Sequence, residues 1–180
     1  MAYSIEQTLV IAVASSVLFD LSQSDAVFRE HGETKYAQYQ KENMDVPLAK
    51  GMAFPFVRRF LSLNRVFVEE LPVEVVLLSR NNPETGLRVF RSIQHYDLDI
   101  KKAAFMSGKS PYKYIPTFNV SLFLSANPED VQHVINAGFP AGTVMPSEIE
   151  DDETDHELYP SHLKMQVSEL RREFRVRHSM

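Results

Sequence analysis

The stretch Thr8-Leu-Val-Ile-Ala-Val-Ala14, followed at once by Ser15-Ser16, is the segment from which the fold can be worked out. A short, continuous apolar run that ends in small polar residues is typical of a β-strand whose two faces are both buried. Strands of this kind lie at the centre of a parallel sheet that is covered by helices on both sides. We therefore predict that the chain begins as an α/β protein.

The remainder of the chain repeats this pattern, with strand-like runs separated by segments of helical periodicity. The predicted strands cover residues 8–14, 73–78, 103–106, 120–124 and 141–145, and the predicted helices cover 22–43 (broken at Gly32), 54–64, 85–96, 112–117 and 128–137. Strict alternation of strands with helical connections implies parallel strands and right-handed crossovers. The predicted fold class is α/β, a doubly wound, mostly parallel sheet of about five strands, followed by a C-terminal helix.

Composition narrows the class of protein further. The 180 residues are 44% hydrophobic and carry a net charge of -5, which excludes an intrinsically disordered chain and disfavours binding to a nucleic acid polymer. There is no cysteine, which excludes a disulfide framework, a thiolate zinc site and a cysteine nucleophile. The apolar run from Leu9 to Phe19 is too short for a membrane span and has no basic segment before it, so we expect a cytoplasmic, soluble protein that binds no membrane.

The C-terminal part of the chain differs in composition from the rest. We predict an α/β domain over residues 1–147, an acidic linker over 148–158 and an amphipathic helical tail over 159–180. The apolar stripe of the tail consists of Leu163, Val167, Leu170 and Phe174. This stripe could dock on the domain or on a second copy of the chain, and the latter would give a homodimer.

Four polar loops follow the predicted strands, at the edge of the sheet where open α/β proteins bind ligands. Hydroxyl groups, backbone N–H groups and a cation are what a phosphate group requires, so these loops indicate a small phosphate pocket. Its candidate ligands are Ser15, Ser16, Ser79, Arg80, Asn81 and Lys109. The alternative interpretation is that the serines and asparagines only cap helices and form turns.

Asp20 is the carboxylate closest to the first strand. A carboxylate there could act as an aspartyl nucleophile or as a Mg²⁺ ligand, and the alternative is an exposed or capping residue. The six histidines show no metal-ligand spacing, so no metal ligand is assigned from the sequence.

Several segments, taken together and in order, resemble the cytosolic 5'-nucleotidase family, the type I-like group that has bacterial members. The resemblance covers residues 8 to about 157 and is carried by Leu18–Phe28, Tyr36–Gln40, Pro47–Phe56, Val73–Asn81, Thr85–Val89, Ser110–Tyr112 and Leu122–Asn127. It implies a haloacid-dehalogenase-like (Rossmann-like) fold, dependence on Mg²⁺, and hydrolysis of nucleoside 5'-monophosphates to nucleoside and phosphate. It also implies that Ser79 and Lys109 hold phosphoryl oxygens.

The chain departs from the family pattern at the first strand, which ends in Ala14-Ser15-Ser16 instead of Asp-x-Asp. In the family a second, similar half follows the acidic stretch and carries that motif, so this chain resembles the N-terminal half only. Two hypotheses remain open. The chain is a nucleotidase in which Asp20 is the nucleophile, or it is a non-catalytic module that binds a nucleoside monophosphate or phosphate and completes or regulates a partner.

Overall fold

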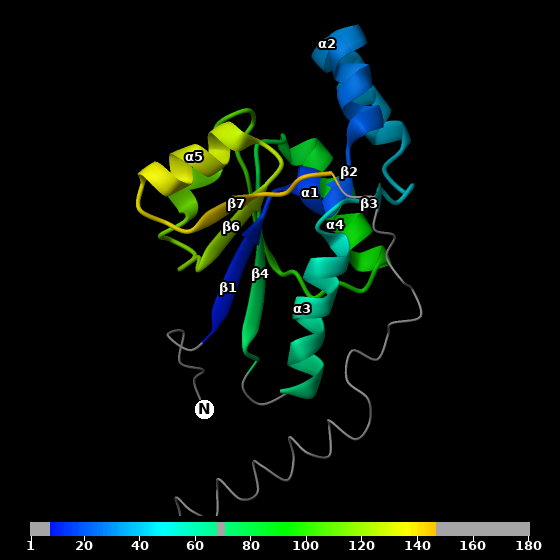
Figure 1. Cartoon of the computed structure of the whole chain (residues 1–180). Helices are drawn as coiled ribbons and strands as arrows, with labels where there is room; N and C mark the ends of the chain where they lie inside the picture. Colours follow the sequence, from blue (N-terminus) through cyan, green and yellow to red (C-terminus); the bar gives the residue numbers. More distant parts are fainter. Residues whose placement is uncertain (1–7, 68–70, 147–180) are drawn as a thin grey trace, which may run out of the picture. The chain divides into compact units, whose positions relative to one another are not determined.

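The computed structural model describes residues 8–67 and 71–146, all of which belong to one unit, Met1–Glu148. Its elements alternate as the sequence predicts (Figure 1). In chain order they are β1 (Leu9–Val13), α1 (Ser15–Leu18), β2 (Phe19–Asp20), α2 (Ser22–Glu42), β3 (Ala49–Lys50), α3 (Phe54–Val66), β4 (Val73–Ser79), α4 (Pro83–His95), β5 (Lys102–Phe105), the 3₁₀ helix η2 (Pro111–Tyr114), β6 (Leu122–Ser125), α5 (Pro128–Asn136) and β7 (Ala141–Thr143).

Five of the strands form one sheet in the order β5-β4-β1-β6-β7, and every neighbouring pair is parallel. The predicted doubly wound α/β fold is therefore confirmed. β1 lies at the centre, between β4 and β6, so the chain builds the sheet outward from β1 first in one direction and then in the other. In open α/β sheets, ligands bind beyond the carboxyl ends of the strands at such a reversal, which here lies between β1 and β6.

Alternation along β4 explains how the sheet is buried on both faces. Val75 and Leu77 belong to the apolar cluster under α3 and α4, whereas Val76 and Leu78 belong to the cluster that includes Ile115 and Val134 of α5. Successive side chains of a strand point to opposite faces, so a continuous apolar run is what a doubly covered strand requires. Figure 1 shows α3 and α4 on one side of the sheet and α5 on the other.

A second, two-stranded sheet carries α2 at the carboxyl end of the main sheet (Figure 1). The sequence predicts a loop over 47–51, but residues 49 and 50 pair with β2 as strand β3. Gly51 explains the close approach: a Cβ atom there would lie 2.6 Å from the carbonyl oxygen of Val17 and 2.7 Å from the nitrogen of Phe19. Such a short pairing depends on a tertiary contact that a local sequence pattern does not contain.

Helix boundaries follow recognisable local signals. Asn82 and Asn127 cap α4 and α5, and each accepts a hydrogen bond from a backbone N–H of the first turn. Gly32, with φ of 74°, interrupts α2 as predicted. The predicted helix over 112–117 is a shorter 3₁₀ turn, because Pro116 removes a backbone donor that a longer helix would need.

No helix in residues 8–67 or 71–146 is long and apolar enough to cross a membrane. The predicted acidic linker over 148–158 and the predicted helical tail over 159–180 lie outside the described residues and stay predictions.

Candidate functional site at the carboxyl edge of the sheet

Three buried serines lie at the carboxyl ends of the three central strands. Ser79 ends β4, Ser125 ends β6, and Ser15 follows β1, which lies between them. Their exposed fractions are 2%, 1% and 2%. A hydroxyl group buried to this degree needs a hydrogen-bond partner, so the partners show what each serine does.

Ser15 and Ser79 are partners of each other. Their Oγ atoms lie 2.7 Å apart, and either hydroxyl could be the donor. Asn81 completes the network: its side-chain Nδ2 donates to Ser15 Oγ at 3.0 Å and its backbone N–H donates to Ser79 Oγ at 3.1 Å. The edge between β1 and β4 is therefore lined by hydroxyl and amide groups that satisfy one another and carry no charge.

The loop that contains Lys109 runs beside this network. The backbone N–H groups of Met106, Ser107 and Gly108 donate to the carbonyl oxygens of Ser79, Asn81 and Arg80, at 2.9, 3.1 and 2.6 Å respectively. Ser107 and Gly108 have positive φ values of 46° and 87°, which turn the chain sharply before the exposed Lys109. The two loops predicted to hold phosphate thus lie at one place on the sheet edge.

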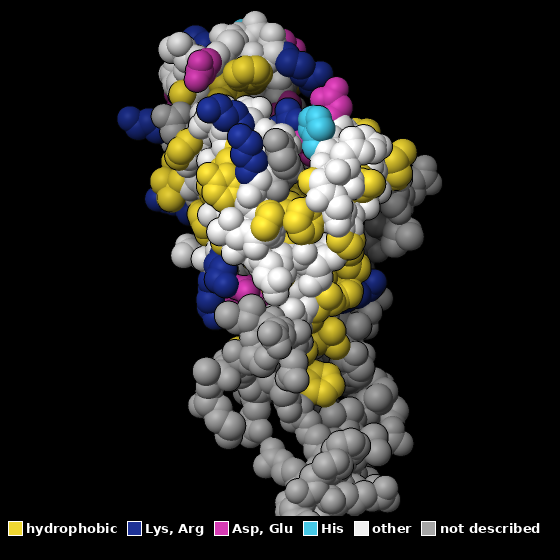
Figure 2. Space-filling model, turned by 90° about the vertical axis from the view of Figure 1, so that its left-hand side faces the viewer, with side chains coloured by type: hydrophobic (Ala, Val, Ile, Leu, Met, Phe, Trp, Pro, Cys, Tyr) yellow, Lys and Arg dark blue, Asp and Glu magenta, His cyan; other side chains and the backbone are white. Residues whose placement is uncertain are grey.

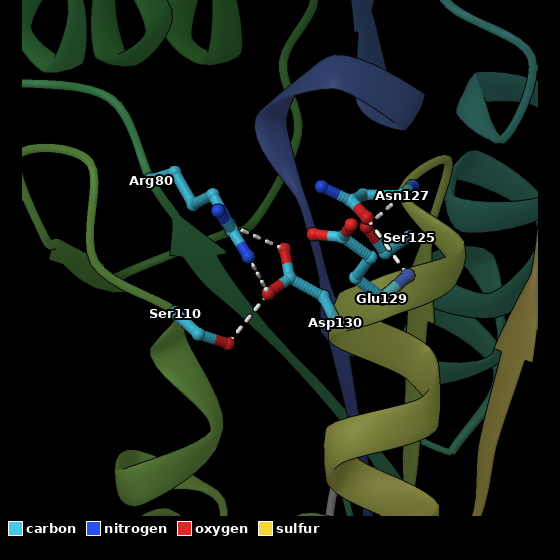
Figure 3. Close-up of polar contacts among 6 residues, drawn as sticks. All are labelled: Arg80, Ser110, Ser125, Asn127, Glu129 and Asp130. Carbon is cyan, nitrogen blue, oxygen red and sulfur yellow. Dashed lines mark hydrogen bonds and ion pairs between the residues drawn. The ribbon is translucent and has the colours of Figure 1, made fainter.

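Arg80 points to the other face of the sheet from Ser79, as strand alternation requires. Its guanidinium donates twice to Asp130 of α5, with Nε to Oδ2 at 2.8 Å and Nη2 to Oδ1 at 2.6 Å (Figure 3). Ser110 Oγ also donates to Asp130 Oδ1. The hydrogen bonds with Asp130 raise the pKa of Arg80, desolvation opposes that rise, and the negative charges of Asp130 and Glu129 add to it.

Asp130 and Ser110 are not among the candidate phosphate ligands predicted from the sequence. Asp130 has the ordinary position of an acidic residue in the first turn of a helix, where the helix dipole favours it. Only the sheet order, which places the start of α5 near the loop after β4, shows that it meets Arg80.

Ser125 and Asn127 form a capping arrangement at the start of α5 (Figure 3). Asn127 donates its backbone N–H to Ser125 Oγ at 3.1 Å, and its Oδ1 accepts the backbone N–H of Glu129 at 2.9 Å. These contacts of Ser125 and Asn127 are those of helix capping, the alternative to phosphate binding that the sequence also allows.

Asp20 and Ser16 do not belong to the hydrogen-bond network of Ser15, Ser79 and Asn81. Asp20 is exposed in β2, which belongs to the small sheet, and its Oδ1 accepts the backbone N–H of Ser22 at 2.9 Å. Hydrogen bonds from the side chain and backbone of Ser22 hold the pKa of Asp20 below its ordinary value, against a small opposing effect of burial. Ser16 is exposed on α1. The positions directly after β1 are therefore Ala14, Ser15 and Ser16, none of which is acidic.

The residues at this edge do not fit a Mg²⁺ ion. Mg²⁺ is bound through one or two carboxylates in near-octahedral oxygen geometry. Here Ser15, Ser79 and Asn81 are neutral and satisfied, and the carboxylate of Asp130 is occupied by Arg80 and Ser110. Within the part of the chain that the structure describes, no group of three or more His, Cys, Asp or Glu residues could hold a metal ion.

One face of the molecule shows how its charged side chains are distributed. On the face seen in Figure 2, Lys and Arg side chains lie in separate groups with apolar and acidic side chains among them. This face presents no continuous basic stripe of the kind through which proteins bind the phosphate backbone of a nucleic acid polymer.

Comparisons with known proteins identify relatives of this chain. A family model described as 5'-nucleotidase matches residues 1–160. Human cytosolic 5'-nucleotidase 1B is 30% identical over 144 residues, which are 77% of this chain and 24% of the human protein. The chain thus spans about a quarter of the length of that relative. Among solved structures, the HAD domain of effector protein Lem4 from Legionella pneumophila matches with a TM-score of 0.44 and 11% identity, over 84% of this chain and 93% of that one.

Proposed function

Because the chain belongs to the 5'-nucleotidase family, we propose that it serves the hydrolysis of nucleoside 5'-monophosphates as a phosphate-binding half that lacks the nucleophile. The observation that supports this proposal is the network of Ser15, Ser79 and Asn81 at the end of β1. Phosphoryl transfer in such folds needs an attacking carboxylate there, and this chain has hydroxyl groups instead.

Ser15 is not a substitute nucleophile. A serine hydroxyl becomes reactive when an adjacent base removes its proton. The partners of Ser15 Oγ are the hydroxyl of Ser79 and the amide of Asn81, and neither group is a base at neutral pH. We therefore propose that the nucleophile, and the Mg²⁺ that the family resemblance implies, belong to a second half and not to this edge.

Binding is the function that the edge supports. A phosphoryl oxygen that took the place of the hydrogen bond between Ser15 and Ser79 would accept from these hydroxyls, and Lys109, whose loop runs beside them, would add a positive charge. Because neither a carboxylate nor a base lies beside Ser15, we propose that these donors bind a phosphate and leave its ester bond intact. The name of the human relative states that it is cytosolic, and we propose the same location for this chain.

Titration calorimetry of the full chain with adenosine 5'-monophosphate and with inorganic phosphate tests binding. We expect Ser79→Ala and Lys109→Ala each to weaken binding by about tenfold, the effect of one charge-assisted hydrogen bond. Ser121→Ala and Lys101→Ala are matched controls at the amino ends of β6 and β5, and they should leave the affinity unchanged. Absence of binding by the wild-type chain would reject the proposal.

Turnover is tested separately, by phosphate release from adenosine 5'-monophosphate with Mg²⁺. We expect no release above a protein-free blank. Release that Asp20→Asn abolishes, while Asp99→Asn retains it, would instead establish an independent hydrolase with Asp20 as its nucleophile.

A further inference from the structure

Arg80 and Asp130 form a clasp across the end of β1. Arg80 follows β4 and Asp130 lies in the first turn of α5, which follows β6, while β1 lies between those two strands. The ion pair therefore joins the segments that follow the two strands on either side of β1, where the sheet order reverses (Figure 3). Ser110, from the loop after β5, holds the same carboxylate.

The clasp occupies one of the two pairs of donors through which Arg80 can bind an anion. Arginine binds carboxylates and phosphates in the same way, through two parallel N–H···O bonds. In Arg80 the pair of donors Nε and Nη2 is taken by the two oxygens of Asp130. Asp130 is 4% exposed and Arg80 is 35% exposed, so the carboxylate is enclosed while the guanidinium still reaches the surface.

The clasp also neutralises the charge of Arg80. A phosphate monoester carries close to two negative charges at neutral pH. It would meet Arg80 already paired with Asp130, and Glu129, next to Asp130 in the first turn of α5, adds a further negative charge. The closed clasp thus opposes the binding of a phosphate at Arg80.

We propose that Asp130 is an internal competitor for phosphate, which keeps Arg80 from a bound nucleotide until the clasp opens. This inference rests on the proposed phosphate-binding function and adds its regulation. The apparent affinity of a site that is competent only part of the time falls in proportion to the competent fraction. Opening a buried ion pair is costly, so the clasp holds the competent fraction low.

The test is titration of the full chain with inorganic phosphate. Asp130→Asn removes the competing charge but keeps an oxygen that can accept from Arg80 and Ser110. We expect it to bind phosphate at least tenfold more tightly than the wild type. The gain should disappear when Arg80→Gln is added, because the released group is then absent. Glu129→Gln is the matched control, since it removes one negative charge from the same helical turn and breaks no hydrogen bond of the clasp; its effect should stay within about twofold.

Ser110→Ala provides a second, gentler variant, because it weakens the hold on Asp130 and changes no charge. It should tighten phosphate binding about threefold, and thermal melting shows whether each variant is folded. Equal effects of Asp130→Asn and Glu129→Gln would overturn the clasp in favour of general electrostatics. A second result would overturn the clasp and leave the proposed function standing. In that case the wild type binds phosphate and Ser79→Ala weakens this binding, but Asp130→Asn and Ser110→Ala leave the affinity unchanged. Absence of binding by the wild type and by every folded variant would overturn both.

Discussion

The hydroxyl oxygens of Ser15 and Ser79 lie 2.7 Å apart, although 64 positions separate the two residues in the chain. The contact exists because β1 and β4 are parallel and in register, with Val13 opposite Leu77, so residues two positions further on meet as well. It links the end of the central strand directly to the loop that carries Asn81 and Arg80.

Removing either hydroxyl should destabilise the domain. We expect Ser15→Ala and Ser79→Ala each to lower the free energy of unfolding by about 1–2 kcal/mol, since each leaves a buried polar partner less well satisfied. The double variant should lose less than the sum, because both changes remove the same hydrogen bond. Urea unfolding of the four proteins measures this, with Ser16→Ala, at an exposed serine, as a control; strictly additive losses would show that the two hydroxyls are not coupled.

Tyr36 holds the second segment of α2 against α4. Its hydroxyl lies 2.6 Å from Thr85 Oγ1, and both residues are buried. Tyr36→Phe should lower stability by about 1 kcal/mol and speed hydrogen exchange in residues 33–42. Tyr114→Phe, at an exposed tyrosine, should change neither quantity. Unchanged exchange in α2 of Tyr36→Phe would mean that this hydrogen bond does not secure the helix.

Gly51 allows the small sheet to lie against α1. In Gly51→Ala the added methyl would meet backbone atoms of Val17, Leu18 and Phe19 at 2.6–2.8 Å, and backbone cannot move as a flexible side chain can. We expect a loss of about 1–3 kcal/mol in urea unfolding. Gly142→Ala is the control, because its Cβ would meet only the Leu124 side chain, at 3.4 Å. Equal stability of the two variants would contradict the close approach.

Asp20 should titrate below its ordinary range. Its folded-state pKa is lowered by Ser22, so its contribution to stability is present above the unfolded pKa of about 3.9 and is lost as the pH falls through the folded value. Carboxyl chemical shifts followed by NMR from pH 6 to 2 measure this directly. Ser22→Ala should raise the pKa part of the way, since the backbone N–H remains. A pKa at or above 3.9 in the wild type would refute the hydrogen bond.

The tail over residues 159–180 supplies a prediction from sequence alone. Its apolar stripe needs a partner surface, and we propose a second copy of the chain. Deleting residues 158–180 should convert a dimer to a monomer in sedimentation velocity, whereas an unchanged mass would dismiss the dimer.

Local sequence patterns were sufficient to predict the main helices and strands of the fold and their order along the chain. Apolar runs such as residues 73–78 are long enough to mark buried strands, and Asn127-Pro128 marks a helix start through capping chemistry that acts within a few residues. The short β2–β3 pairing escaped the sequence analysis because two-residue strands have no periodicity of their own.

The sequence by itself determined the α/β class, the loops that gather at one edge of the sheet, and the absence of an acidic residue directly after β1, because each of these follows from residues close together in the chain. Only the tertiary structure decided how those loops are used. It joins Ser15 to Ser79 and turns Arg80 away to Asp130, since strand alternation sends neighbouring residues to opposite faces and sheet order selects the partner that each one meets there.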